Sequence, residues 1–233
     1  MGDPNVSTLR SVLAEQQRPL LSSRFRLAQI LSAAVLEFHK VGWLHRGISS
    51  LNVAFVYPIG SSWLKCMNDP YLLGFSNSQP DGPDPYFTWL HENDHALMDS
   101  QHPDYLQNKG RVRYRPEFDY YCWNDFNTTY ASAYSGLVHY LGILLLEIGY
   151  WKTLDKIVTK VPDSPEDILN DLRGKHVPKL GIIMGIVYRD VVDTCLKGDF
   201  DSPEFVDGDA SDYSSVILKF AKTVVERLGT CLV

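Results

Sequence analysis

The stretch that decides how this chain folds is Trp43-Leu44-His45-Arg46-Gly47-Ile48-Ser49-Ser50-Leu51-Asn52, a polar loop between two regularly patterned segments. Before it, residues 22–40 place apolar side chains three and four positions apart, which predicts a helix with one buried face. After it come two short apolar runs, at residues 53–57 and 71–75, which predict the strands of a small hairpin. The sequence therefore predicts a helix, a polar loop and a hairpin in this order.

The rest of the chain is predicted to be mainly α, with one long irregular segment. Residues 76–113 are rich in Pro, Asp, Asn and Gly and show no sustained period, which is typical of a loop. Helical spacing returns at residues 134–148 in a stripe so broad that this helix is expected to be buried on most sides. Three further helices are predicted, at residues 164–174, at residues 180–198, and from a cap at Ser211 to Gly229.

Composition and charge favour a globular protein made of one domain, residues 1–233. Of the 233 residues, 45% are hydrophobic and 21% are charged, which excludes a disordered tail. The 22 basic and 28 acidic residues give a formal charge of −6, which argues against a surface that binds a nucleic-acid backbone. The sequence therefore predicts no nucleic-acid partner.

Cysteine usage and hydropathy indicate where the chain would reside. The four cysteines lie far apart and form no C-x-x-C pair, so a reducing cytoplasmic or nuclear compartment is expected. The first twenty residues lack the pattern of a signal peptide. The longest apolar stretch, residues 142–149, is interrupted by Glu147 and is too short to cross a bilayer, so no membrane span is predicted.

Four short motifs stand in order along the chain. They are His45-Arg46 with Asn52 five residues after Gly47, then Gly74-Phe75-Ser76, then Arg115-Pro116-Glu117, and then Asp119 ahead of the apolar run 141–147. In this order they resemble the catalytic loop, the D-F-G strand end, the A-P-E element and the central helix of a protein-kinase C-terminal lobe. The sequences of these motifs are most similar to those of fungal kinase-like (pseudokinase) domains that accompany HeLo-type and prion-inhibition modules. The resemblance implies a helical lobe with a short hairpin after the catalytic-loop equivalent, and an activation-segment-like loop at residues 76–113.

The departures from the kinase pattern decide which chemistry the resemblance implies. Phosphoryl transfer requires one carboxylate for the substrate proton, another for magnesium, a lysine for the phosphates and a glycine-rich cover. Gly47 stands where the first aspartate would be, and Gly74 where the second would be. Only 44 residues precede His45; they read as two helices and contain neither the glycine-rich loop nor the lysine-bearing strand. The resemblance therefore implies a truncated, catalytically inactive module without its N-terminal lobe, with no cofactor expected and with a protein as its partner.

Other roles for the same residues stay open. The enzyme alternative is a divergent kinase whose missing lobe is supplied elsewhere; it would need ATP and Mg, and Asn52 would be the matching residue left to bind them. His45 and Asn52 could instead pin the loop by hydrogen bonds, or His45-Arg46 could be an ordinary polar turn. Arg46 could pair with a phosphate or an acidic side chain of residues 76–113.

A second motif points to a different chemistry. His91-Glu92-Asn93-Asp94-His95 matches H-E-x-x-H, in which two histidines one helical turn apart bind zinc and the glutamate activates water. The third histidine of the extended pattern would fall at Gln101, and the motif lies in the segment predicted to be irregular. A zinc hydrolase is therefore a remote alternative, which zinc binding lost in His91→Ala would support.

Residues 122–140 interrupt the kinase-like order. Joining Tyr121 to Leu141 would lead Asp119-Tyr120-Tyr121 directly into the apolar run of the central helix. We therefore hypothesise a surface insertion or a short intron translated in frame, and sequencing the transcript decides between them. The region after Cys195 also lacks the arginine that pairs with the A-P-E glutamate in kinases, so Glu117 is expected to lack that partner.

Overall fold

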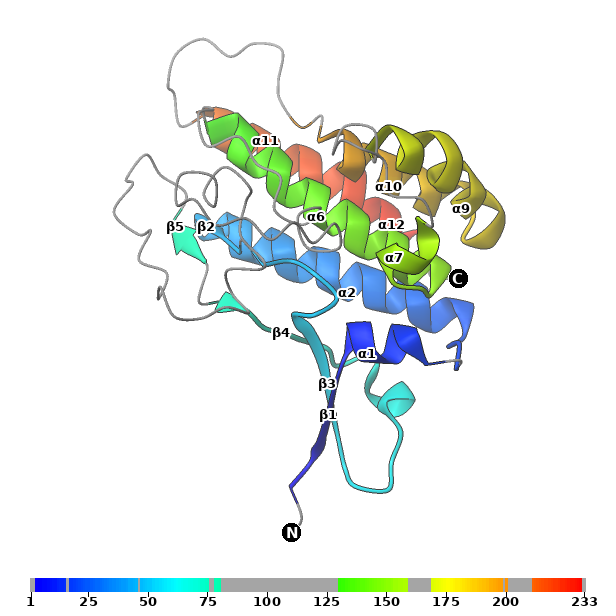
Figure 1. Cartoon of the computed structure of the whole chain (residues 1–233). Helices are drawn as coiled ribbons and strands as arrows, with labels where there is room; N and C mark the ends of the chain where they lie inside the picture. The colour runs from blue at the N-terminus through cyan, green and yellow to red at the C-terminus, as the bar shows by residue number, and fades with distance from the viewer. Residues whose placement is uncertain are drawn as a thin grey trace, which may run out of the picture.

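The structure is a computed structural model, and it describes residues 3–15, 17–45, 47–75, 78–80, 130–158, 169–198, 200 and 211–231. These residues form a bundle of helices with a small antiparallel sheet on one side, which confirms the mainly α fold class (Figure 1). In Figure 1 the helices α2 and α6 run side by side, and the strands β1 and β3 project away from them toward the N-terminus.

The N-terminal part contains a strand that the sequence did not reveal. The structure has β1 (Asn5–Thr8), then α1 (Leu9–Ala14), and then the long helix α2 (Leu21–Lys40). Thr8 ends the strand and begins the helix, because its hydroxyl accepts a hydrogen bond from the Ser11 backbone at 3.2 Å. The predicted helix at residues 22–40 is confirmed as α2, and its buried face includes Leu27, Leu31 and Val35.

The predicted hairpin forms the centre of the small sheet. Strand β3 (Val53–Tyr57) pairs antiparallel with β4 (Tyr71–Leu72), with Val53 opposite Leu72. On its other edge β3 pairs antiparallel with β1, which gives the strand order β1-β3-β4. The connection from β3 to β4 contains the short helix η1 (Trp63–Cys66). A separate two-stranded ladder joins β2 (Trp43–Leu44) to β5 (Gln79–Pro80).

Two stacked tryptophans attach this sheet to the helices. The Trp63 and Trp151 rings lie 5.8 Å apart between centroids and are almost parallel. The Trp63 indole donates to a Glu15 carboxylate oxygen at 2.8 Å, and the Trp151 indole donates to the Gln17 carbonyl at 3.1 Å. The stack therefore joins the β3–β4 connection, the segment after α1 and the residue that follows α6.

The central helix is α6 (Tyr130–Tyr150), followed by the short α7 (Leu154–Ile157). Helix α6 includes the stripe predicted at residues 134–148, and its residues 140–149 are all buried, as the width of the stripe predicted. Glycines let the neighbouring helices approach it. A Cβ on Gly142 would lie 3.0 Å from both the Cβ of Cys195 and the backbone nitrogen of Leu196, and one on Gly149 would lie 2.7 Å from a Leu180 methyl group.

The helix start predicted at residues 164–167 lies outside the described residues, and the predictions for residues 169–198 were partly wrong. The π-helical turn η4 (Leu172–His176) continues directly into α9 (Val177–Ile183), so Gly174 lies inside a helix and does not end it. The helix predicted at residues 180–198 is two helices, because Gly185 adopts a φ of +84° and α10 (Ile186–Lys197) begins after it. The predicted end at Gly198 is confirmed, since this residue caps α10 with a left-handed φ of +65°.

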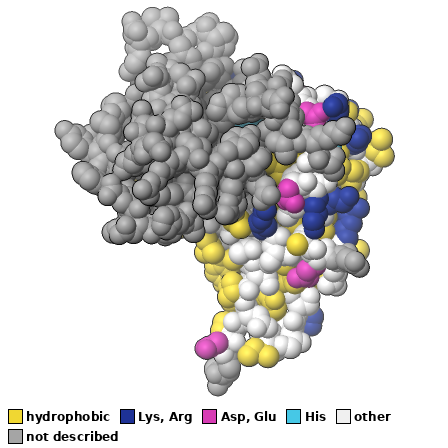
Figure 2. All heavy atoms as spheres, viewed as in Figure 1, with side chains coloured by type: hydrophobic (Ala, Val, Ile, Leu, Met, Phe, Trp, Pro, Cys, Tyr) yellow, Lys and Arg dark blue, Asp and Glu magenta, His cyan; other side chains and the backbone are white. Residues whose placement is uncertain are grey.

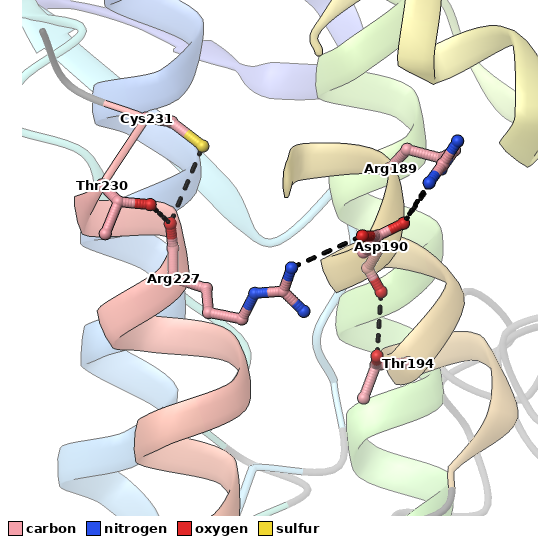
Figure 3. A network of polar contacts seen from close by, with 6 residues as sticks. All are labelled: Arg189, Asp190, Thr194, Arg227, Thr230 and Cys231. Atoms are coloured by element: carbon pink, nitrogen blue, oxygen red, sulfur yellow. Dashed lines mark hydrogen bonds and ion pairs between the residues drawn. The ribbon is translucent and has the colours of Figure 1, made fainter. Parts of the chain in front are cut away.

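The last helical segment runs as predicted from Ser211 to Gly229. It comprises α11 (Ser211–Phe220), the π-helical turn η5 (Ala221–Glu226) and α12 (Arg227–Gly229). A polar network joins its end to α10, as Figure 3 shows. There the Asp190 carboxylate accepts from Arg189 at 2.6 Å and lies 3.4 Å from the Arg227 guanidinium.

Within the described ranges, no helix is long and apolar enough to cross a membrane.

Candidate functional site

The structure brings together five of the residues that the sequence singled out. His45, Gly47 and Asn52 of the predicted catalytic-loop equivalent lie beside Gly74 and Phe75, which follow β4. The remaining ones lie outside the described residues: Arg46, Ser76, His91, His95, Arg115, Pro116, Glu117 and Asp119. Residues 81–129 also lie outside the described residues. They include most of the predicted activation-segment-like loop, residues 76–113, and residues 122–129 of the predicted insertion. Residues 130–140, the rest of that stretch, are helical and continuous with α6.

His45 is the buried anchor of this site. The chain leaves α2 through a turn at Gly42, whose φ is +72°, and passes along β2 into the loop. The His45 side chain is completely buried. Its ring lies edge-on to Phe75 at 4.7 Å and to Phe38 of α2 at 5.7 Å, measured between centroids.

Hydrogen bonds made by His45, which accepts, and by Asn52 hold the loop. The Gly47 N–H is shared between the His45 carbonyl and the His45 Nδ1, which lies 3.3 Å away. The Asn52 Nδ2 donates to the Gly47 carbonyl at 2.7 Å, and the Asn52 carbonyl accepts from the Leu73 N–H at 2.7 Å. Asn52 therefore connects the middle of the loop to the end of β4.

The two glycines are packed against the Asn52 side chain. Gly74 has a φ of +86°, a region that side chains with a Cβ rarely adopt. A Cβ placed there would lie 2.6 Å from the Asn52 Nδ2 and 2.7 Å from its Cγ. A Cβ on Gly47 would lie 3.0 Å from the same Nδ2. Neither glycine could carry a longer side chain unless Asn52 moved.

Burial keeps the histidines at this site neutral. Burial lowers the pKa of His45, and the backbone carbonyls of His45 and Leu73 oppose this only in part. His39, on α2 and packed against Phe220, is also fully buried. Burial and the proximity of His45 lower the pKa of His39 to about 4. Both rings are therefore uncharged at neutral pH.

The described residues at this site offer no carboxylate to a metal ion. Positions 47 and 74, which the predicted kinase-like order aligns with aspartates, are glycines, and glycine offers no side-chain ligand. The Asn52 amide nitrogen is used by the Gly47 carbonyl, and its side chain fills the space next to Gly74. In the part of the chain that the structure describes, no three His, Cys, Asp or Glu side chains are grouped to hold a metal ion.

An exposed apolar surface beside the loop was not predicted from the sequence. It consists of Trp43, Tyr71, Leu73 and Phe75, which are 41%, 54%, 43% and 49% exposed, and we call it the aromatic surface. The Phe38 ring links its two ends, lying 6.4 Å from Trp43 and 5.4 Å from Phe75 between centroids. Figure 2 shows hydrophobic side chains gathered on the side of the molecule that carries β3 and β4. The apolar run at residues 71–75 was the signal available in the sequence.

Comparison of this chain with protein-family models, with curated proteins and with solved structures gives no match.

Proposed function

We propose that this chain is a catalytically inactive, kinase-like helical module, and that it acts by binding another protein. The contact between Asn52 and Gly74 is the observation that carries the proposal. It leaves the site without the carboxylates of phosphoryl transfer and without room for one of them at position 74.

The order of elements supports the kinase-like part of the proposal. A long helix, α2, leads into the His45–Asn52 loop, and the β3–β4 hairpin follows it. Gly74 and Phe75 stand at the end of that hairpin, and the apolar run 141–147 lies in the buried helix α6. The proposed relation to fungal domains with HeLo or prion-inhibition modules rests on the sequences of the motifs alone.

The aromatic surface supports the binding part. The side chains of Trp43, Tyr71, Leu73 and Phe75 are each about half exposed. Contiguous exposed apolar surface costs free energy in water, and in natural proteins it often marks a site of interaction. Aromatic side chains are also enriched where partners bind.

Nucleotide binding is the test that separates this proposal from a divergent kinase. A ligand that binds the folded state raises its melting temperature. We expect no increase when millimolar ATP and Mg are added to the full chain. An increase that is lost in Asn52→Ala would favour the divergent kinase and contradict the proposal.

Partner binding is tested separately with matched surface variants. Trp43→Ser and Phe75→Ser each remove a partly exposed ring from the aromatic surface, whereas Ile59→Ser removes a 66% exposed side chain elsewhere. In cells that express the chain, we expect crosslinking to give a discrete product that both ring variants lose and Ile59→Ser retains. Equal crosslinking by all four proteins would exclude this surface as the binding site.

A further inference from the structure

The hydrogen bond between the Gly47 N–H and the His45 Nδ1 defines the state of the imidazole. A ring nitrogen that accepts a hydrogen bond carries no proton, so neutral His45 holds its proton on Nε2. The Nε2 atom is buried. The loop is therefore built around one tautomer of a buried histidine.

A second proton on His45 would act directly on this bond. The proton would enter at Nδ1, which is the nitrogen with the free electron pair. The acceptor of the Gly47 N–H would then become a donor, and two N–H groups would face each other. Protonation thus removes one of the contacts that hold Gly47, and it places a charge in an apolar site against Phe38 and Phe75.

The contacts beyond Gly47 carry this change to β4. The Gly47 carbonyl is bound by the Asn52 side chain, and the Asn52 carbonyl accepts from Leu73. Gly74 packs against the same Asn52 side chain, and the Phe75 ring rests on His45 itself. The loop and the end of β4 are therefore held by one continuous set of contacts that begins at His45.

We propose that His45 is an acid-sensitive contact. Its protonation releases residues 47–52 together with the Phe75 end of the aromatic surface, while the helical core stays folded. The inference goes beyond the proposed function, because it holds whether or not this surface binds a partner.

The ionisable groups on the neighbouring elements are consistent with this role. On α2 they are Glu37, His39 and Lys40 at the end of the helix that leads to His45, with Arg24 and Arg26 near its start, and on β4 the ionisable residue is Tyr71. Glu37 and Lys40 are exposed and pair with each other at 2.7 Å, and Tyr71 is 54% exposed. A charge on His39 would oppose one on His45. Burial lowers the pKa of His45, so its contacts with Gly47 and Phe75 are intact at neutral pH and are lost only in acid.

The test is a pH titration of the full chain by nuclear magnetic resonance, from pH 7.5 downward. The ring nitrogens of His45 are expected to report the Nε2–H tautomer at neutral pH. Below about pH 6.5, the ordinary pKa of histidine, the Gly47 and Phe75 amide signals should shift with the same midpoint as His45. Over that range the amide signals of Gly142 and Leu144 in α6 should remain in place.

Two variants separate the effect of His45 protonation from general effects of acid. In His45→Asn, the amide oxygen can take the acceptor position of Nδ1 without titrating, so Gly47 should no longer respond to pH. In His39→Asn, which removes the other buried histidine of this region, the Gly47 response should persist. An Nδ1–H tautomer, a Gly47 signal that ignores the His45 titration, or simultaneous loss of the α6 signals would each overturn the proposal. These three results come from the wild-type chain, so they decide the matter even if a variant fails to fold.

Discussion

The helical core and the loop beside the small sheet solve the same problem, the burial of polar groups, in different ways. In the core, the buried Tyr188 hydroxyl donates to the Leu145 carbonyl at 2.7 Å, and the buried Arg24 guanidinium donates to the Gly149 carbonyl at 2.7 Å. The first bond joins α10 to α6, and the second joins α2 to α6. In the loop, the Asn52 side chain and one tautomer of His45 hold a short segment whose neighbours are half exposed.

This difference indicates where stability and where adaptability lie in the molecule. Regions with many buried apolar contacts open only with global unfolding, whereas regions held by few contacts open locally at lower cost. Helices α6, α9 and α10 belong to the first kind, and residues 45–52 with the end of β4 belong to the second.

The seam between α6 and α10 should tolerate no added volume at Gly142. The nearest atoms to a new side chain there are the Cys195 Cβ and the Leu196 backbone nitrogen, neither of which can move alone. We expect Gly142→Val to lower the free energy of unfolding by about 3 kcal/mol or more, measured by urea denaturation. Gly174→Ala is the matched control, because a Cβ at that helical position meets no atom within 4 Å. It should raise stability by about 0.5–1 kcal/mol; similar losses in both variants would mean that the seam is not tightly packed.

Acid should destabilise the protein through His39. Its pKa is about 4 in the folded chain and about 6.5 when unfolded, so the unfolded state binds the proton first as the pH falls. The stabilisation is complete above pH 6.5 and is lost as the pH falls through that value toward 4. At about 1.4 kcal/mol per pKa unit, this histidine alone should remove about 3 kcal/mol between pH 7 and pH 4.

The pH dependence of urea denaturation measures this loss. His39→Leu should flatten the curve between pH 6.5 and pH 4. Glu37→Gln, which changes an exposed carboxylate on the same helix, should leave that part of the curve unchanged. A wild-type slope retained in His39→Leu would assign the acid sensitivity to other groups.

Removing the Asn52 side chain should loosen the loop more than the core. Asn52→Ala loses the bond to the Gly47 carbonyl, and we expect a loss of about 1 kcal/mol in the free energy of unfolding. Hydrogen exchange should rise at residues 47–52 and at Leu73, and should stay unchanged within residues 140–149 of α6. Faster exchange throughout both regions would mean that the loop and the core open together.

The smallest effect is expected at the ion pairs that join α10 to α12. Asp190 contacts Arg189 and Arg227, but all three side chains are about a third or more exposed. Water screens such pairs, so Asp190→Ala should change the free energy of unfolding by less than about 0.5 kcal/mol. Thermal denaturation at low and high salt measures it, and a loss above about 1 kcal/mol would show that this network belongs to the core.

The success of the sequence-based predictions followed the range of the interactions that they used. The helix at residues 22–40, the strand at residues 53–57 and the helix end at Gly198 were predicted correctly, because each depends on local spacing or on one glycine. The strand predicted at residues 71–75 is confirmed only over Tyr71–Leu72, because Gly74 leaves the extended conformation with a φ of +86°. Strand β1 was missed, because its four residues show no strong pattern and gain their structure from pairing with β3, almost fifty residues away. The helix continues through Gly174 but is interrupted at Gly185, since only Gly185 adopts a positive φ. The sequence does not show this difference, because both residues are glycine.

The candidate site shows the same division. The sequence alone determined that residues 47 and 74 are glycines, and therefore that neither can supply the carboxylate on which phosphoryl transfer depends. Only the tertiary structure decided that Asn52 fills the space between them, that His45 is buried in a defined tautomer, and that Trp43 and Phe75 remain half exposed. The identity of a side chain is a local property, whereas its burial, its tautomer and the room around it depend on segments that only folding brings together.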